Sequence, residues 1–194
     1  MRNNMKTDSK KETMTEVVFK DTKLTVPYFS QYVDIQDGDH RLRACGMTSA
    51  YMVLKYFDAE VPTLDDLVER GMHDGGYGPS GWKHDYFVDL FREFGFSCER
   101  KEQMRDKEVE IFRTAIKNYN PVIISAMRRL WDQRIFHMVV ITGIRENEKG
   151  DLEGFFYHDP ASTREDGTSH FYVSLPTFFL DWRRMAILPS RTAV

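Results

Sequence analysis

A change in residue periodicity near Pro121 is the feature that most constrains the fold of this chain. Before Pro121, apolar residues recur three and four positions apart, which is the spacing of one face of a helix. After Pro121, they form short runs rich in β-branched and aromatic side chains, which are typical of strands. The chain is therefore expected to be an α+β protein, with a helical first part packed against an antiparallel β-sheet.

The first part of the chain predicts a helix that begins beside Cys45 and three helices after it. Thr63, followed by Asp66 three residues later, resembles a capping box that begins the second helix, and Gly71 is expected to end it. The expected helices cover residues 46–57, 63–71, 82–94 and 109–119. Cys45 is thereby placed at the junction between a loop and a helix.

The second part predicts antiparallel strands joined by turns. The expected strands include residues 122–124, 138–141, 155–157 and 171–173. Residues 148–151, Glu-Lys-Gly-Asp, supply a turn between the second and third strands, which predicts a hairpin. This hairpin brings His137, expected at the start of one strand, close to Asp159, just past the end of the other.

The length of 194 residues and the hydrophobic fraction of 41% support one domain with a single core. Residues 1–20 are polar and offer little apolar area to offset the entropy of ordering, so they are expected to form a disordered leader. The domain is expected to cover residues 21–194.

Charge and hydropathy exclude several classes of partner. The net charge is only -3 and no long basic run occurs, so no nucleic-acid partner is expected. No apolar run has the length of a secretory signal or a membrane span, so no membrane partner is expected either. Cys45 and Cys98 alone would make a poor disulfide framework, whereas free thiols suit a reducing compartment. A cytoplasmic location is therefore expected, and the oligomeric state stays open.

Cys45 lies in the sequence Arg-Ala-Cys-Gly-Met-Thr-Ser-Ala. A thiol at a helix N-terminus meets the positive end of the helix dipole and unpaired backbone N–H groups, which both favour thiolate. The alternative is a small buried residue that happens to begin a helix. Cys45 is interpreted as a candidate nucleophile.

A nucleophilic cysteine needs a base, and histidine has a pKa suited to that task near neutral pH. His137 is the candidate among six histidines because a strand would hold its ring in a fixed position. Asp159 is followed by Pro160, so a carboxylate at a stiffened strand end can orient the histidine. The alternatives are a structural histidine and an ordinary Asp-Pro turn.

Other candidate residues have weaker local signals. Gln31, in the loop after Val-Pro-Tyr-Phe-Ser, offers a side-chain amide that can stabilise an oxyanion together with the Cys45 N–H. Tyr77, Gly81 and Trp82 belong to a glycine- and aromatic-rich segment that is either a mobile cleft wall or a tight connection with Trp82 in the core. The histidines are scattered without metal-ligand spacing, so no metal and no cofactor are expected.

Taken in order, these motifs resemble a known family over about residues 24–162. The matching stretches are residues 26–31, 44–49, 78–82, 120–124, 137–143 and 157–160. The chain resembles the bacteriocin-processing-peptidase-like family of papain-like cysteine peptidases, family thirty-nine of the cysteine peptidases, in its stand-alone form without a transporter. Met47 departs from this pattern where proline is common, and Phe136 departs from it where glycine is common.

The resemblance implies a papain-like fold in which Cys45 is the nucleophile, His137 the base and acid, Asp159 the orienting residue and Gln31 part of the oxyanion hole. The expected activity is that of a cysteine peptidase or amide hydrolase on a peptide or amide substrate. Two alternatives stay open: an acyl-transferring relative, and a catalytically idle module that binds peptides in the same cleft.

Overall fold

The computed structural model describes residues 18–130, 133–163 and 171–192, and it has an antiparallel sheet at its centre. The sheet order is β4-β9-β5-β6-β7-β8, and β1 pairs with β6 beside this path. The strands are β1 (Phe19–Lys23), β4 (Ser97–Lys101), β5 (Val122–Leu130), β6 (Gln133–Asn147), β7 (Leu152–His158), β8 (Phe171–Ser174) and β9 (Trp182–Ser190). A separate two-stranded ribbon consists of β2 (Tyr77–Gly78) and β3 (Gly81–Trp82).

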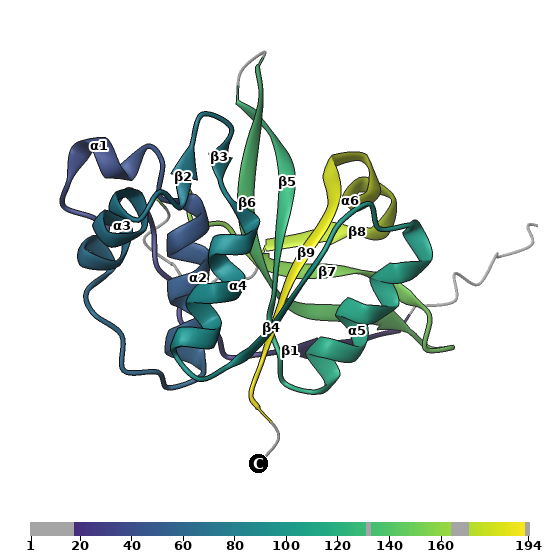
Figure 1. Cartoon of the computed structure of the whole chain (residues 1–194). Helices are drawn as coiled ribbons and strands as arrows, with labels where there is room; N and C mark the ends of the chain where they lie inside the picture. Colours follow the sequence, from purple (N-terminus) through teal and green to yellow (C-terminus); the bar gives the residue numbers. More distant parts are fainter. Residues whose placement is uncertain (1–17, 131–132, 164–170, 193–194) are drawn as a thin grey trace, which may run out of the picture.

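The helices divide into two groups around the sheet. Figure 1 shows α1 to α4 gathered on one side of the molecule, with α5 and α6 at the far part of the sheet. The helices are α1 (Gly38–Arg41), α2 (Cys45–Tyr56), α3 (Leu64–His73), α4 (His84–Glu93), the 3₁₀ turn η1 (Asp106–Val109), α5 (Glu110–Lys117) and α6 (Leu175–Asp181). This α+β architecture confirms the expected fold class.

Helix α2 is the central helix of the helical side because most of its surface is buried. Its buried residues are Gly46, Met47, Thr48, Ser49, Ala50, Met52, Val53 and Leu54. Side chains from the sheet and from α3 and α4 join it in one hydrophobic core. A helix enclosed in this way holds the residue at its first position firmly.

The predicted strands 122–124, 138–141, 155–157 and 171–173 are confirmed, but two of them are much longer than expected. Strand β6 begins at Gln133, so His137 lies inside the strand, opposite Ala126 of β5, and not at its start. The β5–β6 hairpin extends beyond the neighbouring strands and stands out from the sheet in Figure 1. Its polar outer part lacks the apolar pattern from which a strand is predicted.

Two expectations about the helices were wrong. Gly71 does not end α3, which continues to His73. A Cβ at Gly71 would lie 2.9 Å from a ring carbon of Trp82, so this glycine allows the close approach of α3 to the indole. Trp82 itself lies in β3, and the helix predicted over residues 82–94 begins only at His84.

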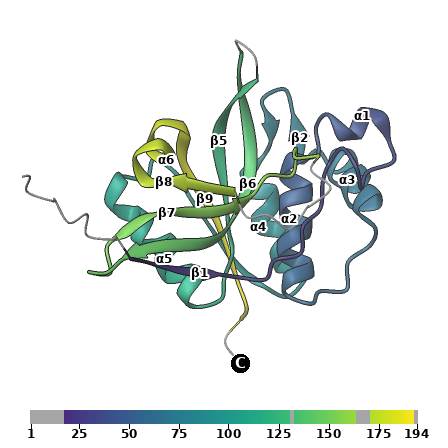
Figure 2. The ribbon, with the colours of Figure 1, turned by 180° about the vertical axis from the view of Figure 1, so that it is seen from behind.

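The first described strand lies at the boundary of the expected leader. Phe19 and Lys20 are the first residues of β1, which runs along β6 toward the helical side in Figure 2. The remainder of the expected leader, residues 1–17, lies outside the described residues. Within the described ranges, no helix is long and apolar enough to cross a membrane.

Candidate active site

Cys45 is the first residue of α2, and the loop before it is held by an indole. Trp82 Nε1 donates a hydrogen bond to the backbone oxygen of Arg43 at 2.5 Å. Ala44, which lies between Arg43 and Cys45, is fully buried and provides no side-chain cap for the helix. The first backbone N–H groups of α2 therefore lie beside a half-buried thiol, as the sequence predicts.

Helix α2 reaches the sheet closely because its second residue has no side chain. A Cβ at Gly46 would lie 2.6 Å from Phe87, 2.9 Å from Trp82 and 3.0 Å from the sulfur of Met138. Ser49 Oγ also donates a hydrogen bond to the backbone oxygen of Met138 at 3.3 Å. The residue that follows His137 thus contacts the helix that carries Cys45.

His137 and Asp159 are joined by a short hydrogen bond between neighbouring strands. His137 Nε2 lies 2.6 Å from Asp159 Oδ1, and His137 is only 7% exposed. Asp159 follows β7 directly, and its Oδ1 also accepts a hydrogen bond from the backbone N–H of Ala161 at 2.8 Å. The Tyr28 hydroxyl donates a hydrogen bond to the backbone oxygen of Asp159 at 2.9 Å. The proximity that the predicted hairpin implied is confirmed.

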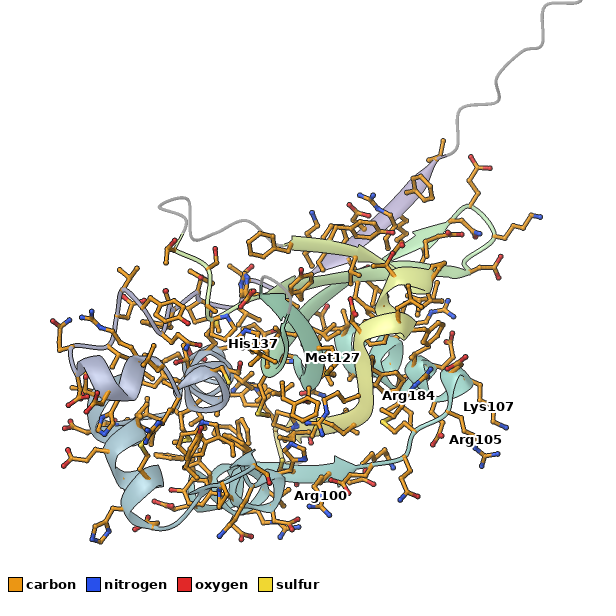
Figure 3. All side chains as sticks on the ribbon, turned by 90° about the horizontal axis from the view of Figure 1, so that it is seen from above. Arg100, Arg105, Lys107, Met127, His137 and Arg184 are labelled. Carbon is orange, nitrogen blue, oxygen red and sulfur yellow. The ribbon has the colours of Figure 1, made fainter. Side chains whose placement is uncertain are left out.

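The three side chains meet between the helical side and the sheet. Figure 3 shows His137 at this boundary. Since Nε2 faces Asp159, Nδ1 is the ring nitrogen left to face Cys45, and the two side chains line the same cavity. The order of contacts is therefore thiol, imidazole, carboxylate.

The pKa values of this pair move toward a thiolate and an imidazolium. Burial alone would raise the pKa of the Cys45 thiol, but the hydrogen bond from His137 and its positive charge lower that pKa overall. Burial would lower the pKa of His137, yet its hydrogen bonds to Asp159 and Cys45 raise that pKa to about 9. By contrast, burial raises the pKa of the Cys98 thiol to about 12.

A cavity of ≈ 150 Å³ opens beside Cys45 and His137. Tyr77, Gly81 and Trp82, the three candidate cleft residues, all line it. Trp82 is 7% exposed and packs against Tyr77, so it supports the wall as part of the core. The segment therefore lines the cavity while Trp82 packs in the core, and the mobility of this wall stays a prediction.

The cavity also contains residues that sequence reasoning missed. Arg43, Ser125 and Arg183 line it together with Phe136, whose ring is 53% exposed. Arg183 belongs to β9, a strand that the sequence pattern did not predict, so nothing pointed to it beforehand. Arg43 precedes Cys45 by two residues, and this position was the one feature of the sequence that could have indicated its place at the cavity.

A second cavity of ≈ 130 Å³ reaches His137 and Asp159 from the α6 side of the sheet. Its walls are mostly apolar and include Ile124, Val139 and Phe178. Cys45 lies outside this second cavity, so the histidine separates an apolar space from the space in front of the thiol.

Gln31 is buried near the Asp159 loop and does not line the cavity that contains Cys45. Its backbone N–H donates to the oxygen of Pro160 at 2.7 Å, and its Nε2 donates to the oxygen of Arg41 at 2.5 Å. Its Oε1 has no hydrogen-bond partner among the described residues. The structure thus brings Cys45, His137 and Asp159 together, whereas Gln31 is buried outside the cavity that contains Cys45.

Metal-ligating side chains do not gather elsewhere in the described part of the chain. No group of three or more His, Cys, Asp or Glu side chains is placed there to hold a metal ion. The arrangement at Cys45 contains the groups needed for nucleophilic attack and proton transfer by side chains.

Comparisons with solved structures give the same fold. A double glycine motif protease from an AMS/PCAT transporter, solved with its leader peptide, is 18% identical over 88% of this chain and 94% of its own, with a TM-score of 0.58. A protein from Bacillus anthracis assigned as a C39-like peptidase is 15% identical over 90% of this chain and 100% of its own, with a TM-score of 0.61. The peptidase domain of Streptococcus ComA, a bi-functional ABC transporter, is 15% identical over 88% and 99%, with a TM-score of 0.52.

A search of curated proteins gives no match. The Peptidase_C39 like family, however, matches residues 23–187, which include every residue of the site described above. The family and the fold support a function of the cysteine peptidase type. On this match, the chain belongs to the Peptidase_C39 like family.

Proposed function

We propose that this protein is a cysteine peptidase or amide hydrolase in which Cys45, His137 and Asp159 form the catalytic triad. The observation that carries this proposal is the 2.6 Å bond between His137 and Asp159, with His137 and the Cys45 thiol lining the same cavity. The family match and the peptidase folds of the neighbours support the same reaction class.

In this mechanism the Cys45 thiolate attacks a peptide or amide carbonyl carbon, and the carbonyl oxygen becomes an oxyanion. The Cys45 backbone N–H donates to that oxyanion. The His137 imidazolium then gives its proton to the leaving amine, the C–N bond breaks, and an acyl-enzyme remains. Water, deprotonated by His137, attacks the thioester and releases the acid and the thiol.

Gln31 is proposed as a second donor to the oxyanion. Its Nε2 carries two N–H groups, and the bond to the Arg41 oxygen occupies one of them. Donation from the other requires the buried Gln31 side chain to turn toward the cavity that contains Cys45. Replacing Gln31 with Ala is therefore expected to lower turnover and to leave thiolate formation at Cys45 unchanged.

A peptide is proposed as the substrate class, and it binds in the cavity lined by Tyr77, Gly81 and Trp82. One structural neighbour is described as a protease in complex with the leader peptide, which supports a peptide in this position. Product masses separate hydrolysis, which adds water to the acyl group, from transfer to another amine or thiol.

The experiment follows the rate of Cys45 alkylation by iodoacetamide against pH, measured by mass spectrometry of intact and digested protein. Wild type is expected to react at a pH well below ~8.5, where an ordinary thiol becomes reactive, because His137 stabilises the thiolate. The His137→Ala variant is expected to lose this advantage.

Cys98 is the internal control in the same sample, since it is buried and the pKa of its thiol is raised to about 12. It should stay unmodified over the pH range in which Cys45 reacts. If Cys45 reacts like an ordinary thiol in wild type and in the His137 variant alike, the triad is refuted and the peptide-binding alternative becomes the better explanation.

A further inference from the structure

Two arginines beside the Cys45 cavity lack the partners that the other arginines have. Among arginines whose side chains the structure describes, all but three form an ion pair with a carboxylate. Arg41 donates instead to the backbone oxygens of Ile35 and Gln36. The remaining two are Arg43 and Arg183, and both line the cavity that contains Cys45.

Arg183 is held in place without being neutralised. Its guanidinium lies 3.4 Å from the centre of the Phe136 ring, and its Nη1 donates to Ser125 Oγ at 3.3 Å. Burial lowers the pKa of Arg183, and the negative charge of the more distant Glu102 offsets this only in part. A guanidinium stacked on a ring keeps most of its N–H donors free for a planar carboxylate.

Arg43 lies on another part of the same cavity. Its guanidinium is 5.9 Å from the centre of the Tyr77 ring. Among the described residues that line the cavity, none is Asp or Glu, and His84 is directed to Glu102 at 3.3 Å. The space in front of the thiol is therefore bordered by fixed positive charge that no side chain of the wall compensates.

We propose that the cleft selects substrates carrying a carboxylate near the scissile bond, and that Arg183 and Arg43 are the specificity-determining residues. This inference rests on the proposed function, because it assigns a substrate class to the Cys45 nucleophile. Both arginines are exposed at the cavity, and neither has a carboxylate partner among the described residues, so their charge is available to attract an anion, which a paired arginine's charge is not. Phe136, which departs from the family pattern, supplies the surface that positions Arg183.

The test compares alkylation of Cys45 by iodoacetate and by iodoacetamide, which differ in charge and have the same reacting carbon. In both cases the thiolate sulfur forms a bond to the CH₂ carbon while the C–I bond breaks and iodide leaves. The His137 imidazolium also attracts iodoacetate, so the decisive quantity is the change in the rate ratio when an arginine is replaced.

Replacing Arg183 or Arg43 with Gln is expected to lower the iodoacetate-to-iodoacetamide ratio about threefold to tenfold, the effect of one unit charge a few ångströms away. The Arg183→Lys variant should retain most of the ratio. Arg184→Gln is the matched control, since it removes the same charge from the next residue. Arg184 pairs with Asp106 and lies beside Arg105 and Lys107, away from His137, in Figure 3.

The two proposals fail in different ways. Slow reaction with iodoacetamide at neutral pH counts against the Cys45 nucleophile itself. Fast reaction with iodoacetamide, with a ratio that Arg183→Gln and Arg43→Gln leave unchanged relative to the Arg184 control, overturns the selectivity alone.

Two further probes identify the source of the carboxylate. Bromoacetyl-glutamate α-amide carries the charge on a side chain, and bromoacetyl-glutamine carries it as a terminal carboxylate. If only the first probe alkylates Cys45 faster when Arg183 is present, the substrate carries an acidic side chain. If only the second probe does so, the substrate carries its carboxylate at a chain terminus. An equal advantage for both supports selection by charge alone, and no arginine-dependent advantage for either contradicts the proposal.

Discussion

Replacing Gly46 with Ala is expected to separate helix α2 from the sheet and so to weaken both stability and thiol reactivity. The added Cβ would lie 2.6 Å from a Phe87 ring carbon, 2.9 Å from a Trp82 ring carbon and 3.0 Å from the Met138 sulfur. Phe87 and Trp82 are rigid rings in the core, at 0% and 7% exposure, so they cannot move aside as a flexible side chain would.

The size of the effect follows from two opposing contributions. Alanine is a better helix former than glycine by roughly 1 kcal/mol, which favours the variant. Overpacking a rigid core costs about 1–3 kcal/mol, and contacts this short belong at the upper end of that range. A net loss of about 1–2 kcal/mol in the free energy of unfolding is therefore expected, which lowers Tm by about 3–6 °C in a chain of this size.

The assay combines denaturant unfolding with the rate of Cys45 alkylation at neutral pH, because helix displacement also moves the thiol from His137. Gly38→Ala is the matched control, since Gly38 also lies in a helix and a Cβ there would meet nothing within 4 Å. The control should be at least as stable as wild type and equally reactive. If the Gly46 variant is as stable and as reactive as the control, the close approach of α2 does not hold the thiol in position.

Two other predictions concern stability. Glu146 is buried between Arg113 (2.5 Å) and Lys117 (2.7 Å). Burial alone would raise the pKa of its carboxyl group, but the hydrogen bonds from Lys117 and Arg113 lower that pKa below its ordinary value. Glu146→Gln should cost about 1 kcal/mol at neutral pH after solvent screening, and in urea titrations the gap from wild type should close as pH falls through the lowered pKa. Thr63 caps α3 by accepting the N–H of Asp66 at 3.2 Å. Thr63→Ala should therefore lower the free energy of unfolding by about 1 kcal/mol, and an unchanged urea midpoint would contradict the cap.

The sequence predicted the elements that contain enough buried apolar residues to leave a clear pattern. Apolar residues recur at helical spacing in α2 and form runs in β6 and β7, and the positive φ of Gly150 fits the turn predicted between these strands. From these elements the closeness of His137 and Asp159 could be inferred, because two strands joined by a short turn are neighbours in a sheet.

The missed strands lack that pattern for physical reasons. Strand β4 lies at an edge of the sheet and consists largely of charged residues, and β1 also pairs on one side only, with exposed side chains. Strand β9 begins with Trp182 and two arginines, so its buried run Met185–Ile187 gave too short a signal. Without β9, Arg183 could not be placed beside Cys45 from the sequence.

The environment of Gln31 was also beyond sequence reasoning. Its position before the cysteine suggested an oxyanion donor, but its hydrogen bonds to the Arg41 and Pro160 oxygens depend on how two distant loops meet. Such long-range contacts leave no local pattern in the chain. The same holds for the cation–π contact of Arg183 with Phe136, which joins β9 to β6.

The pairing of β1 with β6 and of β4 with β9 has a consequence for access to the thiol. Both β1 and β4 come from the part of the chain that also forms the helical side, yet they are hydrogen-bonded into the sheet that carries His137. A hinge motion that swings the helices away from the sheet would have to break these ladders. The entrance is therefore expected to widen by local movement of its wall, such as rotation of Leu42 and Phe136, and not by separation of the helices from the sheet. The cavity in front of Cys45 is therefore expected to accept unfolded segments of a substrate and to exclude a folded protein surface.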